Sequence, residues 1–394
     1  MSDAKRTPAP HIAEVGRPPI PEAVLKVAAE FSGEVDQAGR FPAETFAALR
    51  ERGLLGAFVP GICGGQGSTL ARVASDCQAL GAACSTSGMI LAMHHIQVAC
   101  LARHALGAPW QTAFLRRVAS DQLLLASSTS EAEIGGALRT SSCAIVRHKS
   151  RFEVVKRASA ISYAKNADAI LVTARAHEEA APGDQVLAVL ERDGLMLEPQ
   201  NEWDAMGMRG TGTGAFILTG KGAVRQILAT PFADIAACTM VPISHILWAA
   251  VWTGIAGDAV ARARAFLRKK PPATDGSLPA GAVALAEAVE QLQLAEARIR
   301  TAIAAFDWRT PSLPSFAAAA ADNGLKTGVS DVCLAAAQQA MTVCGFAGYA
   351  RQGPFSVSRH LRDLHSAPLM IANGRMRESA ARLLLAQKPL LGLD

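Results

Sequence analysis

The segment DQLLLASSTSEAEIGGALRT, Asp121 to Thr140, marks a change in the periodicity of the sequence. Before it, apolar residues recur at helical spacing. From it onward, short apolar or alternating runs are separated by Gly, Asp, Asn and Pro, which is typical of β-strands at hairpin spacing. We therefore predict a compact β domain over residues 121–232, with strands in QLLLASSTS, SCAIVRH, FEVVKR, AILVTARA, QVLAVLER and GAFILTG.

Helical periodicity lies on both sides of this predicted β domain. Upstream, apolar residues repeat every three to four positions, which predicts an N-terminal helical domain over residues 21–120. Downstream, long apolar runs predict a C-terminal four-helix bundle in a domain over residues 233–394. The runs are Ile246 to Lys270, Ala282 to Trp308, Gly324 to Cys344 and Ala372 to Leu385. Residues 1–20 are proline-rich and are expected to form a flexible arm, so the predicted fold class is α+β, mostly α.

Composition restricts the possible partners. The chain of 394 residues is 50% hydrophobic and 19% charged, which excludes a disordered protein. Its formal net charge of +5 includes no block of like charges, so we expect no nucleic-acid partner.

No signal peptide and no apolar run of about 18 residues is visible, so we expect no membrane segment and a cytoplasmic location. The eight cysteines form no C-x-x-C pair and are expected to be reduced.

Four segments carry possible site chemistry, and each has an ordinary structural alternative. The hydroxyls of Ser127 to Ser130 and the glycines Gly135 and Gly136 suit the polar edge of a flat heterocycle, although the pattern alone favours a polar turn. ISYAKNADAILVTARA places Ser162 and Tyr163 before a strand, or is a plain hairpin connection. MGMRGTGTGAF suggests that Arg209 lies near a negative group. CGFAGYARQGPFSVSRHLRD is either a helix C-cap or a cation cluster for pyrophosphate.

Metal and classical catalytic motifs are not evident. His94 with His95, and Cys100 with His104, are the best metal candidates, but no H-E-x-x-H pattern surrounds them, so structural or substrate-facing histidines are favoured. Neither G-x-S-x-G nor G-x-G-x-x-G is present.

Taken in order, five segments resemble motifs of the acyl-CoA dehydrogenase superfamily, from Pro21 to Leu385. RFPAETFAALRERGLLGAFVP with GGQG is similar to the family's first helix pair and the loop after it. SEAEIGGA falls at the T-E-P-G-A-G-S-D position and AMGMRGTGT at M-G-x-R-x-S-x-T. GFAGY and RHLRD occupy the G-G-x-G-Y and R-x-x-R-D positions. The resemblance implies a helical domain, a β domain and a four-helix bundle.

The resemblance also implies an FAD-dependent oxidoreductase. The substrate would be an acyl-CoA or an acyl group on a carrier protein, and the electron acceptor would be an electron-transfer flavoprotein or oxygen. By the same correspondence, the flavin ring would meet Ser128, Thr129 and Ser130 at its pyrimidine edge, with Ile161 and Ser162 beside its central ring. The FAD tail would meet Arg268, Gly345 and Gly348 across a subunit interface, in a homodimer or homotetramer.

The sequence departs from the family at the catalytic base. The family's catalytic glutamate falls at Ile371. The alternative position of the base, early in the first bundle helix, falls at Leu247. Neither residue can take a proton, because both side chains are aliphatic. The family's Arg-x-x-Phe contact is Arg268-Lys269-Lys270-Pro271 here. Three hypotheses follow: a dehydrogenase with a relocated base, a flavin monooxygenase of the same superfamily, or a degenerate member. The candidates for a relocated base are Glu131, Asp204, His245 and His365.

Overall fold

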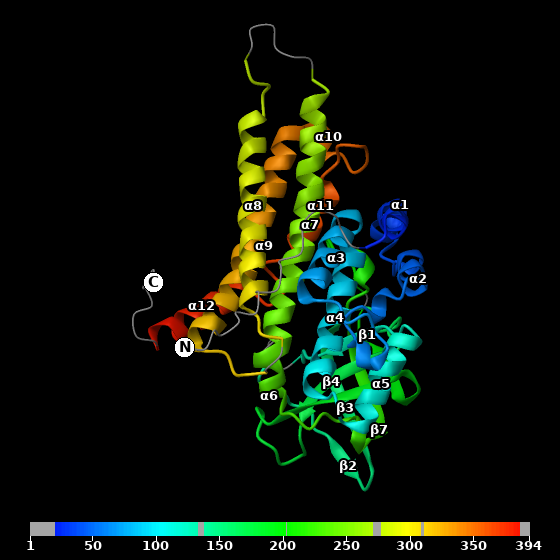
Figure 1. The fold of residues 1–394 in the computed structure, drawn as a ribbon. Coiled ribbons are helices and arrows are strands. Elements are labelled where there is room, and N and C mark those ends of the chain that lie inside the picture. The colour runs from blue at the N-terminus through cyan, green and yellow to red at the C-terminus, as the bar shows by residue number, and fades with distance from the viewer. Residues whose placement is uncertain (1–19, 133–137, 202, 271–276, 309–310, 387–394) are drawn as a thin grey trace, which may run out of the picture.

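The computed structural model describes residues 20–132, 138–201, 203–270, 277–308 and 311–386. It is mostly helical, with a β region in the middle of the chain, as predicted (Figure 1). The proposed arm, apart from Ile20, and the glycine pair Gly135 and Gly136 lie outside the described residues.

Within the described residues, five α-helices precede the first strand. They are α1 (Glu22–Ala38), α2 (Ala43–Glu51), α3 (Leu70–Ala83), α4 (Ser85–His104) and α5 (Pro109–Ser120). The Thr69 hydroxyl caps α3 by accepting from the backbone N–H of Arg72, and proline begins α5, where its missing N–H costs no helical bond. Most residues of α4 are buried, as its small and apolar sequence predicts, because α4 lies between α3, α7 and β1.

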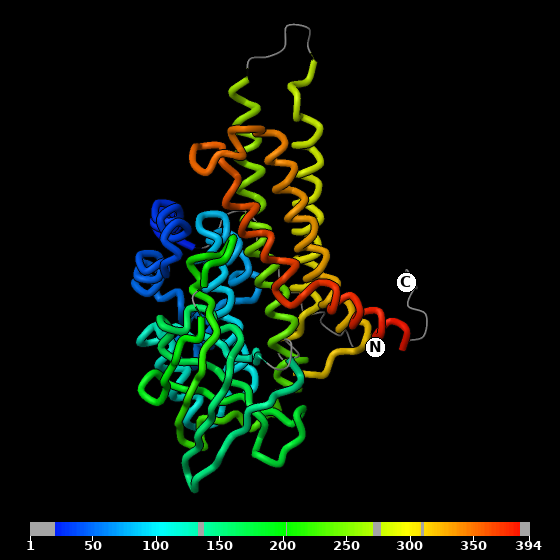
Figure 2. Tube along the Cα trace, turned by 180° about the vertical axis from the view of Figure 1, so that it is seen from behind, coloured from blue at the N-terminus to red at the C-terminus, as the bar shows by residue number. Residues whose placement is uncertain are grey.

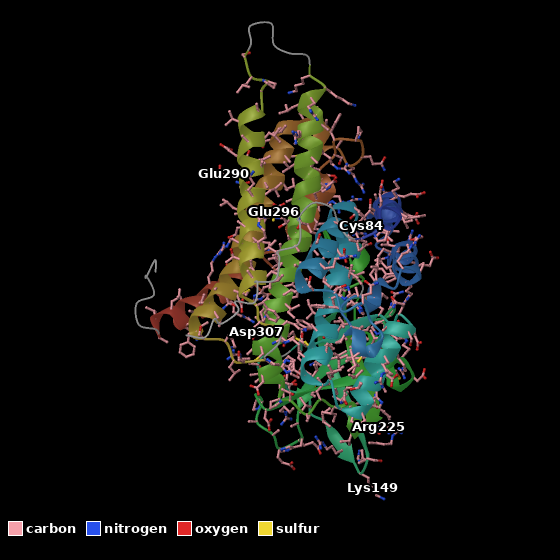
Figure 3. The ribbon with its side chains drawn as sticks, viewed as in Figure 1. Cys84, Lys149, Arg225, Glu290, Glu296 and Asp307 are labelled. Atoms are coloured by element: carbon pink, nitrogen blue, oxygen red, sulfur yellow. The ribbon has the colours of Figure 1, made fainter. Side chains whose placement is uncertain are left out.

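In the described parts of the chain, seven strands form two sheets. The first contains β1 (Leu125–Ser128), β4 (Ala169–Arg175) and β5 (Gln185–Glu191), and the second contains β2 (Val146–His148), β3 (Arg151–Ile161), β7 (Gly214–Ala223) and β6 (Leu195–Pro199). Hairpins join β2 to β3 and β4 to β5. In contrast, β1 and β4 pair in parallel, because β2 and β3 of the other sheet intervene and the chain re-enters in the same direction. The β2–β3 hairpin turns at Lys149, at the end of the molecule far from the C-terminal end of α7 (Figure 3).

The C-terminal helices follow β7. They are α6 (Phe232–Ile235), a π-helical segment (Ala236–Met240), α7 (Val241–Arg268), α8 (Ala282–Ala305), α9 (Phe316–Cys344), α10 (Phe346–Tyr349), α11 (Ser358–Leu364) and α12 (Asn373–Leu385). α7, α8 and α9 lie side by side, with α8 antiparallel to the other two, and α12 packs against α9 (Figures 1 and 2).

Helix α7 forms the centre of the molecule. Residues 232–268 are long and apolar enough to cross a membrane by length and composition, but 89% of the apolar window is buried inside the protein. Glycines let α7 approach α3 closely, since a Cβ on Gly254 would lie 1.9 Å from the carbonyl oxygen of Gln78. The segment is therefore the core helix that joins the N-terminal helices to the bundle.

Candidate functional site

A cavity of about 570 Å³ lies where the N-terminal helices, the β region and the bundle meet. Its walls come from α4, the ends of β1 and β3, the loop before β7, the start of α7 and the turn after α11. Apolar side chains cover most of them, namely Met89, Met93, Ile96, Trp203, Met206, Met208, Met240, Trp248, Leu369 and Met370. Among the described residues, no Asp or Glu lines this space. The cavity therefore suits a largely apolar molecule.

Side chains of β1 point alternately to the two faces of the sheet, and this alternation decides which hydroxyls reach the cavity. Ser127 and Thr129 line it, and neither hydroxyl has a hydrogen-bond partner within the described parts of the chain. Ser128 points to the opposite face, where its hydroxyl is buried and unpaired. Ser130 lines the cavity, but its hydroxyl donates to the carbonyl oxygen of Ala160 (3.0 Å) and accepts from the Ala160 N–H (3.2 Å).

A directional chain of hydroxyls follows the end of β3. Thr211 Oγ1 donates to the carbonyl oxygen of Met208 (2.8 Å), so it can only accept from Thr213 Oγ1 at 2.8 Å. The Thr213 proton is then used, so Ser162 donates to Thr213 at 2.7 Å. Consequently Ser162 presents lone pairs to the cavity and can accept a hydrogen bond from a ligand N–H or O–H. Ile161 is fully buried and does not line the cavity.

His245 is the buried base of the cavity. Its Nδ1 lies 3.0 Å from the carbonyl oxygen of Asp322, which can only accept, so the proton is on Nδ1 and Nε2 keeps a free lone pair. His245 lines the cavity, and Nε2 has no partner among the described residues. Burial lowers the pKa of His245 to about 4, and Lys326 adds a smaller effect in the same direction. The imidazole is therefore neutral at physiological pH, and Nε2 accepts hydrogen bonds.

The low pKa of His245 makes the protein acid-labile in a defined pH range. In the unfolded chain His245 takes up a proton below about pH 6.5, whereas in the folded chain it does so only below about pH 4. The unfolded state therefore binds more protons between these pH values, and the free energy of unfolding falls as the pH falls through this range. His245→Asn keeps a donor for Asp322 and removes this titration. From pH 7 to pH 5, we expect the wild type to lose about 2 kcal/mol more unfolding free energy than the variant. Urea unfolding at both pH values measures the difference, and equal losses would contradict this role.

His94 has a structural role. Its Nε2 donates to the carbonyl oxygen of Leu55 (2.8 Å) and its Nδ1 accepts from the Leu125 N–H (3.1 Å), so both ring nitrogens are used. His104 contacts Thr239 instead of a cysteine. In the part of the chain that the structure describes, no group of three or more His, Cys, Asp or Glu side chains is arranged to hold a metal ion.

Two parts of the chain match models of one protein family. Residues 20–122 match the acyl-CoA dehydrogenase N-terminal domain and residues 237–376 match the acyl-CoA dehydrogenase C-terminal domain. The chain belongs to the acyl-CoA dehydrogenase family. Membership makes it a flavin-dependent oxidoreductase. The chain matches none of the curated proteins with which it was compared.

Solved structures share the fold at low sequence identity. TdsC from Paenibacillus sp. A11-2, in complex with FMN and indole, is 20% identical, with a TM-score of 0.80 over 93% of this chain and 96% of that chain. KijD3 in complex with dTDP is 22% identical, with a TM-score of 0.77 over 93% and 95%. The prolyl acyl carrier protein oxidase AnaB is 15% identical, with a TM-score of 0.75 over 93% and 98%.

The structure separates the four candidate bases of this acyl-CoA dehydrogenase family member. His245 and His365 line the cavity, and so does Ile371, which stands at the position of the family's glutamate. Glu131 is buried in an ion pair with Lys156 outside the cavity wall. Asp204 is exposed and pairs with Arg209. The two carboxylates are thus used for structure, and two histidines remain.

The residues predicted for the FAD tail lie elsewhere. Arg268 ends α7, 23 residues after His245, and this length of helix spans about 35 Å. Gly345 caps the N-terminus of α10 and Gly348 lies within it, and α10 follows α9 at the same end of the bundle (Figure 1). Arg268 is exposed and has no ion-pair partner in the described parts of the chain. One chain therefore does not place these three residues at its own cavity.

Arg362 and Asp363, two members of the cluster in CGFAGYARQGPFSVSRHLRD, join elements of the fold. Arg362 pairs with Asp36 of α1 and donates to the carbonyl oxygen of Met206 (2.8 Å). Asp363 accepts from the Met208 N–H at 2.6 Å. Arg209 donates to the carbonyl oxygen of Asp36 (2.9 Å) and pairs with Asp204. These contacts hold the 204–209 loop between α1 and α11, where it forms part of the cavity wall.

Two residues of the site, Thr211 and Thr213, were not predicted from the sequence, and their side chains line the cavity beside the predicted Thr129, Ser130 and Ser162. Ser127 was among the hydroxyls that suit a heterocycle, but the family resemblance did not assign it to the flavin. Strand alternation contained the signal for it, since Ser127 shares a face with Thr129. Two further wall residues, Gln97 and Trp248, have polar atoms (Oε1 and Nε1) that are buried without a partner among the described residues.

Proposed function

We propose that the cavity holds the ring system of the flavin. The observation that carries this proposal is the combination of free hydroxyls on one wall, Ser127 and Thr129, with methionines and tryptophans around them. Ser162 offers an acceptor for a ring N–H. When bound, the flavin supplies two-electron redox chemistry and, in its reduced form, reaction with dioxygen.

Replacing Thr129 with valine tests this placement. The change keeps the shape and removes the hydroxyl, so flavin binding should weaken by about 1 kcal/mol, or about 3 kcal/mol if a buried flavin atom is left unpaired. Ser128→Ala is the matched control, because its side chain points away from the cavity. Titration of the apoprotein with FMN and with FAD, followed by flavin fluorescence, measures both dissociation constants. Equal constants for wild type and Thr129→Val would place the ring elsewhere.

We propose that the protein is a flavin-dependent monooxygenase that acts on an apolar substrate. A dehydrogenase of this family needs a base for the α-proton, and the position of that base is held by Ile371. His245, with its pKa near 4, is a weak base at neutral pH and is better suited to accept a hydrogen bond from a substrate O–H or N–H. The apolar walls keep water from the reacting atoms. The fold shared with the dibenzothiophene monooxygenase TdsC supports this proposal.

Oxidation of an acyl thioester, on CoA or a carrier protein, is the second candidate. It is favoured by the free lone pair of His245 Nε2 in the cavity, and by the fold shared with the carrier-protein oxidase AnaB. In that reaction His245 would take the α-proton, and an electron-transfer flavoprotein or oxygen would accept the electrons.

Two rates distinguish these reactions. A monooxygenase consumes oxygen when its flavin is reduced and does not need an artificial acceptor, whereas a thioester dehydrogenase reduces such an acceptor when acyl-CoA is added. Acyl-CoA-dependent reduction of a dye without oxygen uptake would overturn the monooxygenase proposal. A purified protein that stays colourless after incubation with FMN and FAD would instead indicate a degenerate member.

We propose FAD as the flavin, with its tail held by Arg268, Gly345 and Gly348 of a neighbouring subunit. A homodimer or homotetramer is then required. The surface of α8 supports such an assembly, because apolar side chains exposed on one chain can be buried against another. Three residues of α8 are buried (Ala288, Ala295 and Ile299), while the apolar residues Val283, Val289 and Leu294 are exposed. Light scattering at micromolar concentration tests the assembly, and a monomeric mass would contradict it.

FMN is the alternative flavin. It is favoured because the tail residues of a single chain lie far from its own cavity, and because structures of TdsC and KijD3 contain FMN. Chromatography of the flavin released by heat identifies the cofactor.

We also propose a cytoplasmic location, in line with eight free cysteines of which seven are buried.

A further inference from the structure

Lys326 on α9 is a fully buried lysine that contacts no carboxylate directly in the part of the chain that the structure describes. Its Nζ donates to the carbonyl oxygens of Ala367 (2.9 Å) and Ile371 (2.9 Å) and to Oδ1 of Asn373 (2.7 Å). All three ammonium protons are thus used by one short stretch of chain. We call this stretch, residues 366–373, the 366–373 turn.

The 366–373 turn forms part of the cavity wall. Leu369, Met370 and Ile371 line the cavity, although Leu369 is also 75% exposed to solvent. Ile371 has a φ of 51°, a left-handed conformation that is strained for a β-branched residue. Such a conformation persists only where surrounding contacts impose it. Lys326 supplies such contacts, because it binds the carbonyl oxygen of Ala367, near the start of the turn, and that of the strained residue Ile371.

Asn373 connects the same turn to α9 a second time. Its Nδ2 donates to Ser330 Oγ (2.8 Å) and to Asp331 Oδ1 (3.0 Å), one turn of helix after Lys326.

Burial lowers the pKa of Lys326 to about 8. The negative charge of Asp331 opposes this effect, and the positive charge of Arg377 adds to it. The ammonium is therefore mainly charged at neutral pH, and charged donors make the stronger hydrogen bonds to carbonyl groups.

We propose that Lys326 is a positioning residue that holds the 366–373 turn in its strained form, and thereby sets the shape of the substrate side of the cavity. The part of this inference that concerns substrate rests on the proposed function; the part that concerns the turn does not. Lys326 acts through Met370 and Ile371, which contact the cavity space.

Hydrogen exchange of the flavin-loaded enzyme tests the positioning role. The backbone N–H groups of Leu369 and Met370 donate to Ser366, and that of Asn373 donates to Pro368, so they report on the turn. Lys326→Met should raise their exchange rates about tenfold or more relative to wild type, because the turn opens locally. Asn373→Ala, which removes one acceptor of Lys326 and both hydrogen bonds from Asn373 to α9, should also raise these exchange rates. Unchanged exchange in both variants would overturn the proposal.

The matched control is Lys156, the other fully buried lysine among the described residues, which lies in β3 away from the cavity. Lys156→Met should lower global stability and leave the exchange of the 366–373 turn unchanged at a denaturant concentration where the enzyme is folded. If it raises exchange there as much as Lys326→Met does, Lys326 has only a general stabilising role, and the proposal fails.

Binding of indole, an apolar ring with one N–H, tests the effect on the substrate side. Titration of the flavin-loaded enzyme, followed by the flavin absorbance, should give a dissociation constant about tenfold higher for Lys326→Met, with flavin affinity within about twofold of wild type. An unchanged constant, despite faster exchange, would overturn the role in substrate shape. A wild type that binds flavin and not indole would overturn that part as well. A wild type that binds no flavin would overturn the proposed function, while exchange of the protein as purified would still decide the role of Lys326.

Discussion

Replacing Gly254 with alanine is expected to destabilise the protein by about 3 kcal/mol, the upper end of the usual cost of overpacking a core. A Cβ at this position would lie 1.9 Å from the carbonyl oxygen of Gln78 and 3.0 Å from the backbone nitrogen of Ala82. Both atoms belong to the backbone of α3, so no side-chain rotation relieves the overlap, and the two helices must separate. Gly81 adds to the contact, since its Cβ would lie 2.8 Å from the carbonyl oxygen of Val251.

Gly257 is the matched control for this experiment. It lies three residues later in α7, and a Cβ there meets no atom within 4 Å. Gly257→Ala should therefore stabilise the protein by up to about 1 kcal/mol, since alanine favours the helix. Urea unfolding at equal flavin concentration, with the slope of each transition compared, measures both changes. If Gly254→Ala were as stable as Gly257→Ala, the close approach of α3 and α7 would be wrong.

Replacing Lys156 with methionine is expected to cost about 3 to 5 kcal/mol, because it leaves a buried charge without its partner. Lys156 Nζ lies 3.1 Å from Glu131 Oε1 and also donates to the backbone oxygen of Thr173 at 2.7 Å. Burial disfavours the charge on Glu131, but Lys156 and the hydrogen bonds from Ser141 and Ser142 outweigh it and lower the pKa of Glu131 to about 2. The carboxylate thus depends on the ammonium group.

The pH dependence and a double variant distinguish this mechanism from simple loss of packing. Without Lys156, burial should raise the pKa of Glu131 above its ordinary value, so the variant should lose less stability than the wild type as the pH falls from 7 to 5. Adding Glu131→Gln should recover part of the loss, because the unpaired charge is removed. Unfolding at both pH values measures these effects. A double variant no more stable than Lys156→Met would show that charge is not the cause.

Glu131 also shows where sequence reasoning could not decide a role. Its place beside a row of hydroxyls made it a reasonable candidate for a relocated base. The residue that neutralises it, Lys156, is 25 positions away on β3, and sequence alone does not reveal that their side chains meet. The same limit applied to Asp204, whose partner Arg209 is close in sequence but reaches it only because the loop folds back against α1.

The sequence by itself determined the order of the elements and indicated the segments that carry the candidate site. Periodicity and turn residues are local properties, so the change at Asp121, the long apolar runs after Pro231 and the hydroxyls near Ser130 and Ser162 could be identified directly. The parallel pairing of β1 with β4 was not predicted, because it depends on which sheet the intervening strands join.

Only the tertiary structure decided which side chains face the cavity and which are already used. Ser127 lines the cavity and Ser128 does not, because a strand turns successive side chains to opposite faces and the position of α4 and α7 selects the face. Ile371 takes a strained conformation because Lys326, 45 residues earlier, binds its carbonyl oxygen. Such contacts join residues distant in sequence, and their partners depend on how whole elements pack, which no local pattern encodes.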